Sequence, residues 1–265
     1  MLRLWLTRRW LVGTLVAIVF GFACFMLGRW QWGRYVEKQT KATAIATNYD
    51  AAPVPLTPTL LGVPLSPERQ WTRVTAHGTY AAEADLLVRN RTLNTVPGFE
   101  VLTVLTTQAG TILVDRGWVP NATTAAEVPG VDAPPQGPVE VTGWLRTGEP
   151  SLGRDLPAGQ LASIDIDDAR TQRPAVGPAD IYLVLGAQSP ATPASGHPVT
   201  PLPRPTEDLG PHQAYAIQWW ITMPGGIAFV FWAVRREVLA RDETEDGAPA
   251  PPKPKKVRIW DEEDY

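Results

Sequence analysis

The sequence predicts a membrane protein in which two transmembrane α-helices flank a β-rich extracytoplasmic domain. Two apolar runs without a charged residue lie towards the two ends of the 265-residue chain. Most of the prolines and glycines fall between these runs, where they interrupt helices and favour short strands and turns. Several short runs in the same region alternate apolar and polar residues, as strands do. We therefore expect an α+β domain built on an antiparallel sheet or a small barrel.

The first apolar run covers residues 10–27. As a helix it would extend about 27 Å, which suits the roughly 30 Å hydrocarbon core of a bilayer. Aromatic side chains anchor a span at the two interfaces, and four tryptophans stand at such positions around this run: Trp5, Trp10, Trp30 and Trp32.

The same run also resembles two kinds of export signal. Arg8 and Arg9 precede it like the pair of a twin-arginine signal. Cys24 stands as in a lipoprotein cleavage site, although Gly21 occupies a position where an aliphatic residue is expected. The run is long for a signal-peptide core, and no small-residue cleavage site follows it before Arg29. We expect an uncleaved anchor in a bacterial protein, since no Arg- and Ser-rich mitochondrial leader precedes the run.

The second apolar run covers residues 215–234 and is equally free of charge. Pro224 and the glycines that follow it predict a kink, which a membrane helix tolerates better than a soluble one. Arginines outside both spans favour cytoplasmic ends, although basic residues also follow the first span. We expect a multi-pass protein of the cytoplasmic membrane with five segments. These are a cytoplasmic N-terminus, a first span, the extracytoplasmic domain, a second span with its interfacial first turn, and a disordered cytoplasmic tail: residues 1–9, 10–27, 28–211, 212–234 and 235–265.

Within the middle segment, six runs are typical of strands: residues 70–76, 86–91, 99–107, 111–119, 139–145 and 181–185. Residues 108–110 predict a hairpin turn between the third and the fourth of them. Helix is expected at residues 33–47, continuing from the first span, and at residues 166–171.

Composition excludes several classes of function. The net charge is -3 with both signs mixed, so no nucleic-acid surface is expected. Cys24 is the only cysteine, and His77, His197 and His212 are too scattered for a dedicated metal site. His77 and His197 are expected to be solvated. No catalytic triad, phosphate loop or nucleotide fingerprint occurs, and we expect no enzyme activity.

Four motifs, in this order along the chain, resemble the Surfeit locus protein 1 family. They are Leu-Gly-Arg-Trp-Gln-Trp-Gly-Arg-Tyr at residues 27–35, Leu-Val-Arg-Asn-Arg at 87–91, Ile-Leu-Val-Asp-Arg-Gly-Trp-Val-Pro at 112–120 and Pro-His-Gln-Ala-Tyr-Ala-Ile-Gln-Trp-Trp at 211–220. Asp115 departs from the pattern, because many relatives carry asparagine there. The resemblance covers roughly residues 10–235.

The resemblance implies a non-enzymatic assembly factor for haem–copper cytochrome c oxidase, an enzyme of the respiratory chain. In bacteria the family is linked to haem a, which it receives from the synthase or helps to insert into the main oxidase subunit. The implied partners are oxidase subunits, haem a synthase and membrane lipid, and the implied cofactor is haem a. One alternative is a permanent accessory subunit that stabilises its neighbours in the oxidase complex. Another is an exported binding domain whose residues 215–234 form a soluble core helix.

His212 is the strongest candidate for a haem ligand. Pro211 suits the first position of a helix, which places His212 in the first turn of the second span. A neutral imidazole can serve as an axial ligand of haem iron. At helical spacing Tyr215, Ala216 and Trp219 are expected on the same face, offering a hydroxyl, room for close approach and an aromatic wall. The competing interpretation is that this face anchors the helix at lipid headgroups or packs against the first helix.

Four further residues are candidates for the site: Trp30, Gln31, Arg91 and Arg116. Gln31 and Trp30 leave the first span at a depth similar to that of His212, and we expect Gln31 to bond Tyr215 or the open N–H groups of the second helix, mainly for helix cohesion.

In the β-rich domain, Arg89 and Arg91 are expected on the same side of a strand. Arg91 and Arg116 are candidates for pairing with haem propionates or with an oxidase subunit, because guanidinium binds carboxylates bidentately. Glu83, Asp85 and Asp115 offer ordinary ion pairs instead.

Overall fold

The computed structural model describes residues 5–81, 85–123 and 127–245. The chain divides into two compact units. A helical unit takes in the chain up to Val36 and from Gly210 onward, and a β unit covers Glu37–Leu209. The β unit begins later than the predicted residue 28, because the first helix continues well past the apolar run.

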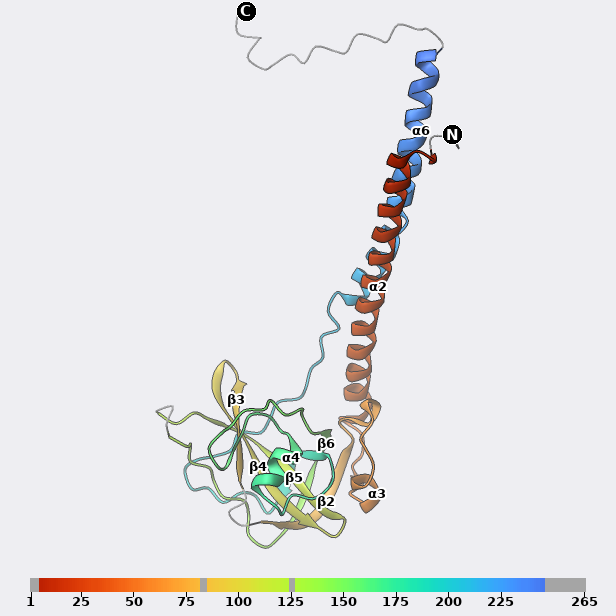
Figure 1. Cartoon of the computed structure of the whole chain (residues 1–265). Coiled ribbons are helices and arrows are strands. Elements are labelled where there is room, and N and C mark those ends of the chain that lie inside the picture. The colour runs from red at the N-terminus through yellow and green to blue at the C-terminus, as the bar shows by residue number, and fades with distance from the viewer. Residues whose placement is uncertain (1–4, 82–84, 124–126, 246–265) are drawn as a thin grey trace, which may run out of the picture. The chain divides into compact units, whose positions relative to one another are not determined.

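Helix α2 (Arg8–Asn48) is uninterrupted over 41 residues (Figure 1). It contains the apolar run at 10–27 and the expected helix at 33–47, so both predictions are confirmed. The second apolar run forms helices α5 (His212–Thr222) and α6 (Gly225–Glu245). They are separated at residues 223–224, where Pro224 has no N–H to continue the helical bonding, so the helix is interrupted at the proline where a kink was expected.

Helix α6 continues to Glu245 instead of ending at Val234. The prediction of a disordered tail is therefore wrong for residues 235–245, where charged side chains with good helix propensity follow the apolar run. The remainder of the predicted tail, residues 246–265, lies outside the described part of the chain.

Within the helical unit, α2 packs antiparallel against α5 and α6. The buried residues Trp10, Ala17 and Cys24 recur every seven positions, as along a coiled-coil seam. Trp10 and Ala17 form an apolar cluster with Val230 and Val234 of α6.

Two glycines of α2 permit this close approach. A Cβ added at Gly21 would lie 3.3 Å from the carbonyl oxygen of Met223, and one added at Gly28 would lie 2.2 Å from Nε1 of Trp220. The second distance is far shorter than a van der Waals contact, so only glycine leaves room for the indole. Small residues permit close approach in the same way in many membrane helix pairs.

Both helical segments are long and apolar enough to cross a membrane. Only 17% of the most apolar window of α2 is buried, and 11% of that in residues 212–242. A core helix of a soluble protein would be mostly buried, so the alternative of a soluble core helix at 215–234 finds no support. Large apolar side chains such as Val12, Phe22 and Phe229 are exposed instead, as on a lipid-facing surface.

The β unit is built on eight strands among the described residues: β1 (Val54–Pro55), β2 (Arg73–Tyr80), β3 (Leu86–Leu93), β4 (Val96–Thr107), β5 (Gly110–Pro120), β6 (Pro138–Thr147), β7 (Gln160–Leu161) and β8 (Ile181–Ser189). All six predicted strands are present, and the β4–β5 hairpin turns at the expected residues. The two-residue strands β1 and β7 are too short to show a periodic pattern and were not predicted. Short helices complete the unit: α3 (Pro58–Leu61), η1 (Pro67–Arg69) and α4 (Ile166–Gln172).

Strands β2, β6, β8, β5 and β4 form a closed ring, because β2 pairs with β4 as well as with β6. The expected small barrel is therefore present, with β3 extending from β4 and β7 from β3. The sheet is mixed, however, since the pairs β1–β2, β3–β7 and β5–β8 are parallel. Between β5 and β8 the chain runs through β6 and α4, which gives the long connection that parallel neighbours require.

Two apolar clusters cover the two faces of this barrel. The cluster that includes Val74, Leu105 and Leu183 comes from the strands of the closed ring and fills its interior. The second cluster includes Leu102 and Ile166, so it lies between the outer face of the sheet and α4. Strand β5 is buried on both faces, which brings its polar residues into the core.

Candidate functional site

The helical unit brings His212 and Gln31 into direct contact. Nδ1 of His212 lies 2.8 Å from Oε1 of Gln31, and both side chains are half-buried. We expected Gln31 to bond Tyr215 or a backbone N–H of the second helix, and the structure instead places its amide on the His212 ring. If Nδ1 carries the proton and donates to Gln31, Nε2 keeps its lone pair. An imidazole held in this way can coordinate a metal through Nε2.

The prediction that Tyr215, Ala216 and Trp219 share one helix face with His212 is only partly correct. Ala216 is fully buried, whereas Tyr215 is 46% exposed and Trp219 is half-buried. Ala216, Trp220 and Met223 follow the seven-residue seam of the helix pair, and this packing decides which residues turn inwards.

Trp220 therefore packs against α2, although Trp219 was expected to form the aromatic wall beside His212. Its indole fills the space above Gly28, and its ring centroid lies 5.7 Å from that of Trp32. Trp30 is 59% exposed. The exposed hydroxyl of Tyr215 and the indole of Trp30 remain available to a ligand or a lipid headgroup.

Arg91 belongs to an ion-pair network inside the β unit. Its Nε lies 2.9 Å from Oε2 of Glu100, and its Nη2 donates to Glu149. Oε2 of Glu149 also accepts from the backbone N–H of Ile164 at 2.9 Å, which fixes the carboxylate. The guanidinium of Arg91 is thus shared between two acidic residues of its own chain.

The expectation that Arg89 and Arg91 lie on one side of a strand is wrong. Arg89 stacks over Phe99, 5.6 Å from the ring centroid, whereas Arg91 binds Glu100. Phe99 and Glu100 are consecutive residues of β4 and point to opposite faces. The cause is a bulge between Val88 and Arg91, where Asn90 adopts a left-handed backbone conformation with φ 58°.

Arg116 is almost fully buried, with 1% of its side chain exposed. Its Nη2 donates to the carbonyl oxygen of Asp132 at 2.7 Å, and its Nη1 lies 3.7 Å from Oδ2 of Asp85. Burial lowers the pKa of Arg116, and the Asp85 carboxylate partly offsets this. The contact with Asp85 is the ordinary ion pair that was considered as the alternative to ligand binding. Glu83, which was considered for the same role, lies outside the residues that the structure describes.

Asp115 adds a further carboxyl group to the core. Oδ1 accepts from the backbone N–H of Gly117 at 3.0 Å. Burial raises the pKa of Asp115 well above its ordinary value, and the nearby Glu100 raises it further. Burial raises the pKa of Glu100 as well, against the opposing effect of Arg91. Folding therefore favours the protonated form of Asp115 relative to the unfolded chain.

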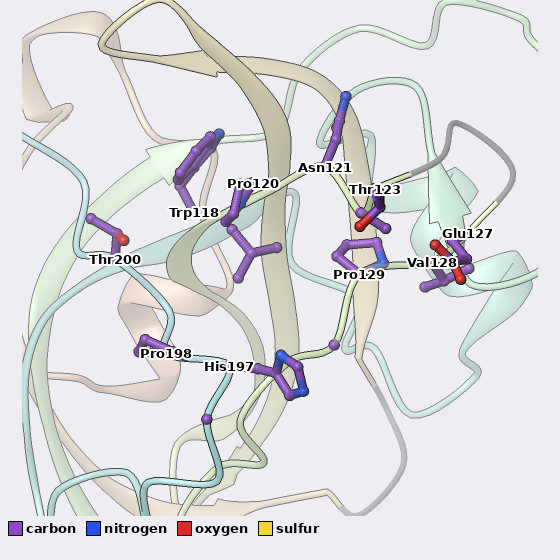
Figure 2. A pocket seen from close by; sticks show the side chains of 14 residues that line it. Trp118, Pro120, Asn121, Thr123, Glu127, Val128, Pro129, His197, Pro198 and Thr200 are labelled. Carbon is purple, nitrogen blue, oxygen red and sulfur yellow. The ribbon is translucent and has the colours of Figure 1, made fainter.

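A cavity of about 610 Å³ lies beside the end of β5. Figure 2 shows Trp118 and His197 apart on two segments that line this cavity, with Pro120 next to Trp118. His197 is exposed, as expected, and so is His77 on β2. Within the described ranges no group of three or more His, Cys, Asp or Glu side chains could hold a metal ion.

Sequence reasoning found Gln31 and His212 but missed their contact, and it also missed Glu149. Gln31 and His212 are 181 residues apart, and Arg91 and Glu149 are 58 apart. Of these contacts, only that between Arg91 and Glu100 could be expected from the sequence, because the two residues lie on strands that form a hairpin.

These features define a class of protein in which two candidate membrane spans flank a mixed-sheet barrel domain. A histidine of one span contacts a glutamine of the other. The SURF1 family model matches residues 18–223. SURF1-like proteins of Mycobacterium bovis and of two Mycobacterium tuberculosis strains, described as uncharacterized, are 33% identical over 267 residues. The matches cover 94% of this chain and 92% of each relative. The chain belongs to the SURF1, or Surfeit locus protein 1, family, as its motifs predicted.

Proposed function

We propose that this protein is a non-enzymatic assembly factor for haem–copper cytochrome c oxidase and that it binds haem a through His212. Membership of the SURF1 family supports the first part. The contact between His212 and Gln31 carries the second part. In this proposal the protein resides in the cytoplasmic membrane, its β unit is extracytoplasmic, and its partners are oxidase subunits and haem a synthase.

The residues present suit a haem. When bound, haem a supplies an iron that accepts an imidazole nitrogen as an axial ligand. Gln31 would hold the His212 ring in one orientation and one tautomer, as outer hydrogen-bond partners do for metal-binding histidines. On the same helices Tyr215 and Trp30 are exposed and Trp219 is half-buried, and they offer a hydroxyl donor and aromatic surface.

Arg91 and Arg116 have a structural role in this proposal. Arg91 is shared between Glu100 and Glu149, and Arg116 is buried against Asp85 and the carbonyl of Asp132. Recruiting either guanidinium to a propionate would leave partly buried carboxylates or a carbonyl without a partner, which is costly.

An absorbance spectrum of the protein tests the proposal. The full chain is co-expressed with the enzymes of haem a synthesis and purified in detergent. Wild type is expected to show a haem band, His212→Ala to lose it, and Gln31→Leu to bind haem less tightly, because the ring loses its orienting partner. His77→Ala is the matched control, since His77 is exposed on β2. Equal haem content in wild type and His212→Ala would refute the ligand assignment.

A strain that lacks the gene tests the assembly function separately. We expect reduced haem a absorbance in membranes and reduced oxygen consumption by cytochrome c oxidase, both restored by the wild-type gene. Restoration by His212→Ala to the same level would show that assembly does not need this ligand. Normal oxidase in the deletion strain would refute the assembly function itself.

A further inference from the structure

A rigid joint holds the C-terminal end of α2 against the barrel within the β unit. Nδ2 of Asn48 donates to the carbonyl oxygens of Glu68 and Gln70, each at 2.8 Å. The ring of Tyr49 stacks on Trp144, with centroids 4.2 Å apart and planes 9° apart. Nε1 of Trp144 donates to the carbonyl oxygen of Tyr49 at 2.9 Å. These contacts hold the last turn of α2 against the barrel.

A cavity of about 490 Å³ lies beside this joint, between α2 and the barrel. Lys41 and Ile45 of α2 line one side, and Trp71 and Arg146 line the other. Three prolines add to its apolar surface. The volume falls in the range of roughly 300–1,000 Å³ that is typical of small-molecule sites.

Arg146 is the positively charged group of the barrel wall. Its Nε donates to Oε1 of Gln70 at 3.1 Å, and its guanidinium carbon lies 4.3 Å from the ring centroid of Trp71. Oε1 of Gln70 also accepts from the N–H of Thr147 at 3.3 Å, so the amide that holds Arg146 is itself fixed. Within the described residues Arg146 forms no ion pair within 4 Å and its two terminal nitrogens have no hydrogen-bond acceptor, although its charge lowers the pKa of the more distant Glu100. The guanidinium is thus preorganised to donate to an anion.

Trp71 beneath Arg146 has a strained backbone. Its φ is 63°, in the left-handed region that a bulky side chain rarely adopts, and its N–H donates to the carbonyl oxygen of Leu145 at 2.9 Å. Such strain persists only where the surrounding structure enforces it, and it gathers at ligand sites. Here it presents the indole to the guanidinium of Arg146.

The acidic residues on the same walls limit the charge of a ligand. Glu149 is bound by Arg91, and Glu207 lies 3.7 Å from Nζ of Lys38. Both carboxylates line the cavity and would repel a dianion. A single negative charge placed at Arg146 avoids most of this repulsion.

We propose that this cavity is a binding site for a small monocarboxylate with an apolar body. The carboxylate pairs with the terminal nitrogens of Arg146, and the apolar body lies against Ile45 and the prolines. The proposal is independent of haem binding at His212, and its test uses no haem.

The test is ¹⁹F NMR of 4-fluorobenzoate with the full chain in detergent. Wild type is expected to broaden the fluorine signal, and Arg146→Gln to bind at least about tenfold more weakly, because a charge-assisted hydrogen bond is lost. The control is Arg154→Gln, which removes an exposed arginine outside the cavity and should leave binding unchanged. Neutral 4-fluorobenzamide and doubly charged 4-fluorophenyl phosphate should both bind more weakly than the benzoate.

Ile45→Glu provides a second variant that leaves Arg146 and its partners in place. It adds a negative charge to the α2 wall and is expected to abolish binding of 4-fluorobenzoate. This variant decides the question if Arg146→Gln does not fold. The proposal is overturned if the benzoate binds Arg146→Gln or Ile45→Glu as tightly as wild type. It is equally overturned if the benzamide or the phenyl phosphate binds wild type as tightly as the benzoate does.

Discussion

Replacing Gly28 with alanine tests the packing of the helix pair. The added Cβ would lie 2.2 Å from Nε1, 2.5 Å from Cδ1 and 2.9 Å from Cε2 of Trp220. All three distances are shorter than a normal contact, so the indole or the helices must move. Overpacking of this kind costs about 1–3 kcal/mol. Alanine also favours the helix by about 1 kcal/mol over glycine, which offsets part of that cost.

Gly33→Ala is the matched control on the same helix. A Cβ at Gly33 meets nothing within 4 Å, so this variant gains helix propensity without a clash. We expect Gly28→Ala to be less stable than Gly33→Ala by about 1–3 kcal/mol. Unfolding in mixed micelles with rising SDS fraction, followed by tryptophan fluorescence, measures the difference.

A double variant separates the clash from other effects of the alanine. Trp220→Leu shortens the side chain that the new Cβ meets, so Gly28→Ala should cost less in that background than in wild type. If Gly28→Ala and Gly33→Ala change stability equally, the predicted close approach of the helices is wrong.

Two further predictions concern the β unit. Asp115→Asn keeps an acceptor for the Gly117 N–H, but it removes a carboxyl whose pKa burial raises in the folded state. A group with a raised folded pKa stabilises the protein at low pH, and this contribution is lost as pH rises through the folded pKa. The free energy of unfolding of Asp115→Asn relative to wild type should therefore increase from pH 4 to pH 8. The increase is about 1.4 kcal/mol for each unit by which folding raises the pKa. Thermal unfolding across this range measures it, and a difference independent of pH would contradict the assignment. Arg91→Met leaves the partly buried Glu100 and Glu149 without their shared cation and should destabilise the protein by about 1.5–3 kcal/mol in denaturant unfolding. Adding Glu149→Gln should recover part of this loss, and a purely additive double variant would argue against a shared ion pair.

Much of the secondary structure was predictable because its signals are local. Residues 10–27 and 215–234 are apolar for long enough to cross a bilayer, and Pro224 breaks the second helix through its missing N–H. The alternation in residues 111–119 revealed β5, although that strand is buried on both faces. The end of the second helix was misjudged, since charged residues after Val234 neither favour nor exclude a helix by their polarity alone.

The candidate site was predictable only residue by residue. His212 and Gln31 could be selected from motifs and from their positions near span ends, but their contact depends on how the two helices pack. The bulge before Arg91 places Arg89 and Arg91 on opposite faces of β3. A bulge adds one residue to one strand of a pair, and the alternation of apolar and polar residues did not predict it. Trp71 and Arg146 were not predicted as site residues. Their role in the proposed anion site depends on the strained backbone of Trp71 and on a contact between residues 75 positions apart.

The amino-acid sequence was enough to predict the two apolar segments, the main strands of the barrel and the family to which the chain belongs. These follow from hydrophobic length, from periodicity and from short motifs, all of which are written within a few consecutive residues. The tertiary structure alone decided the parallel pairing of β5 with β8, the burial of Ala216 instead of Tyr215, and the partners of each arginine. Those outcomes depend on register and packing between distant segments, where a shift of one residue changes the face that a side chain occupies.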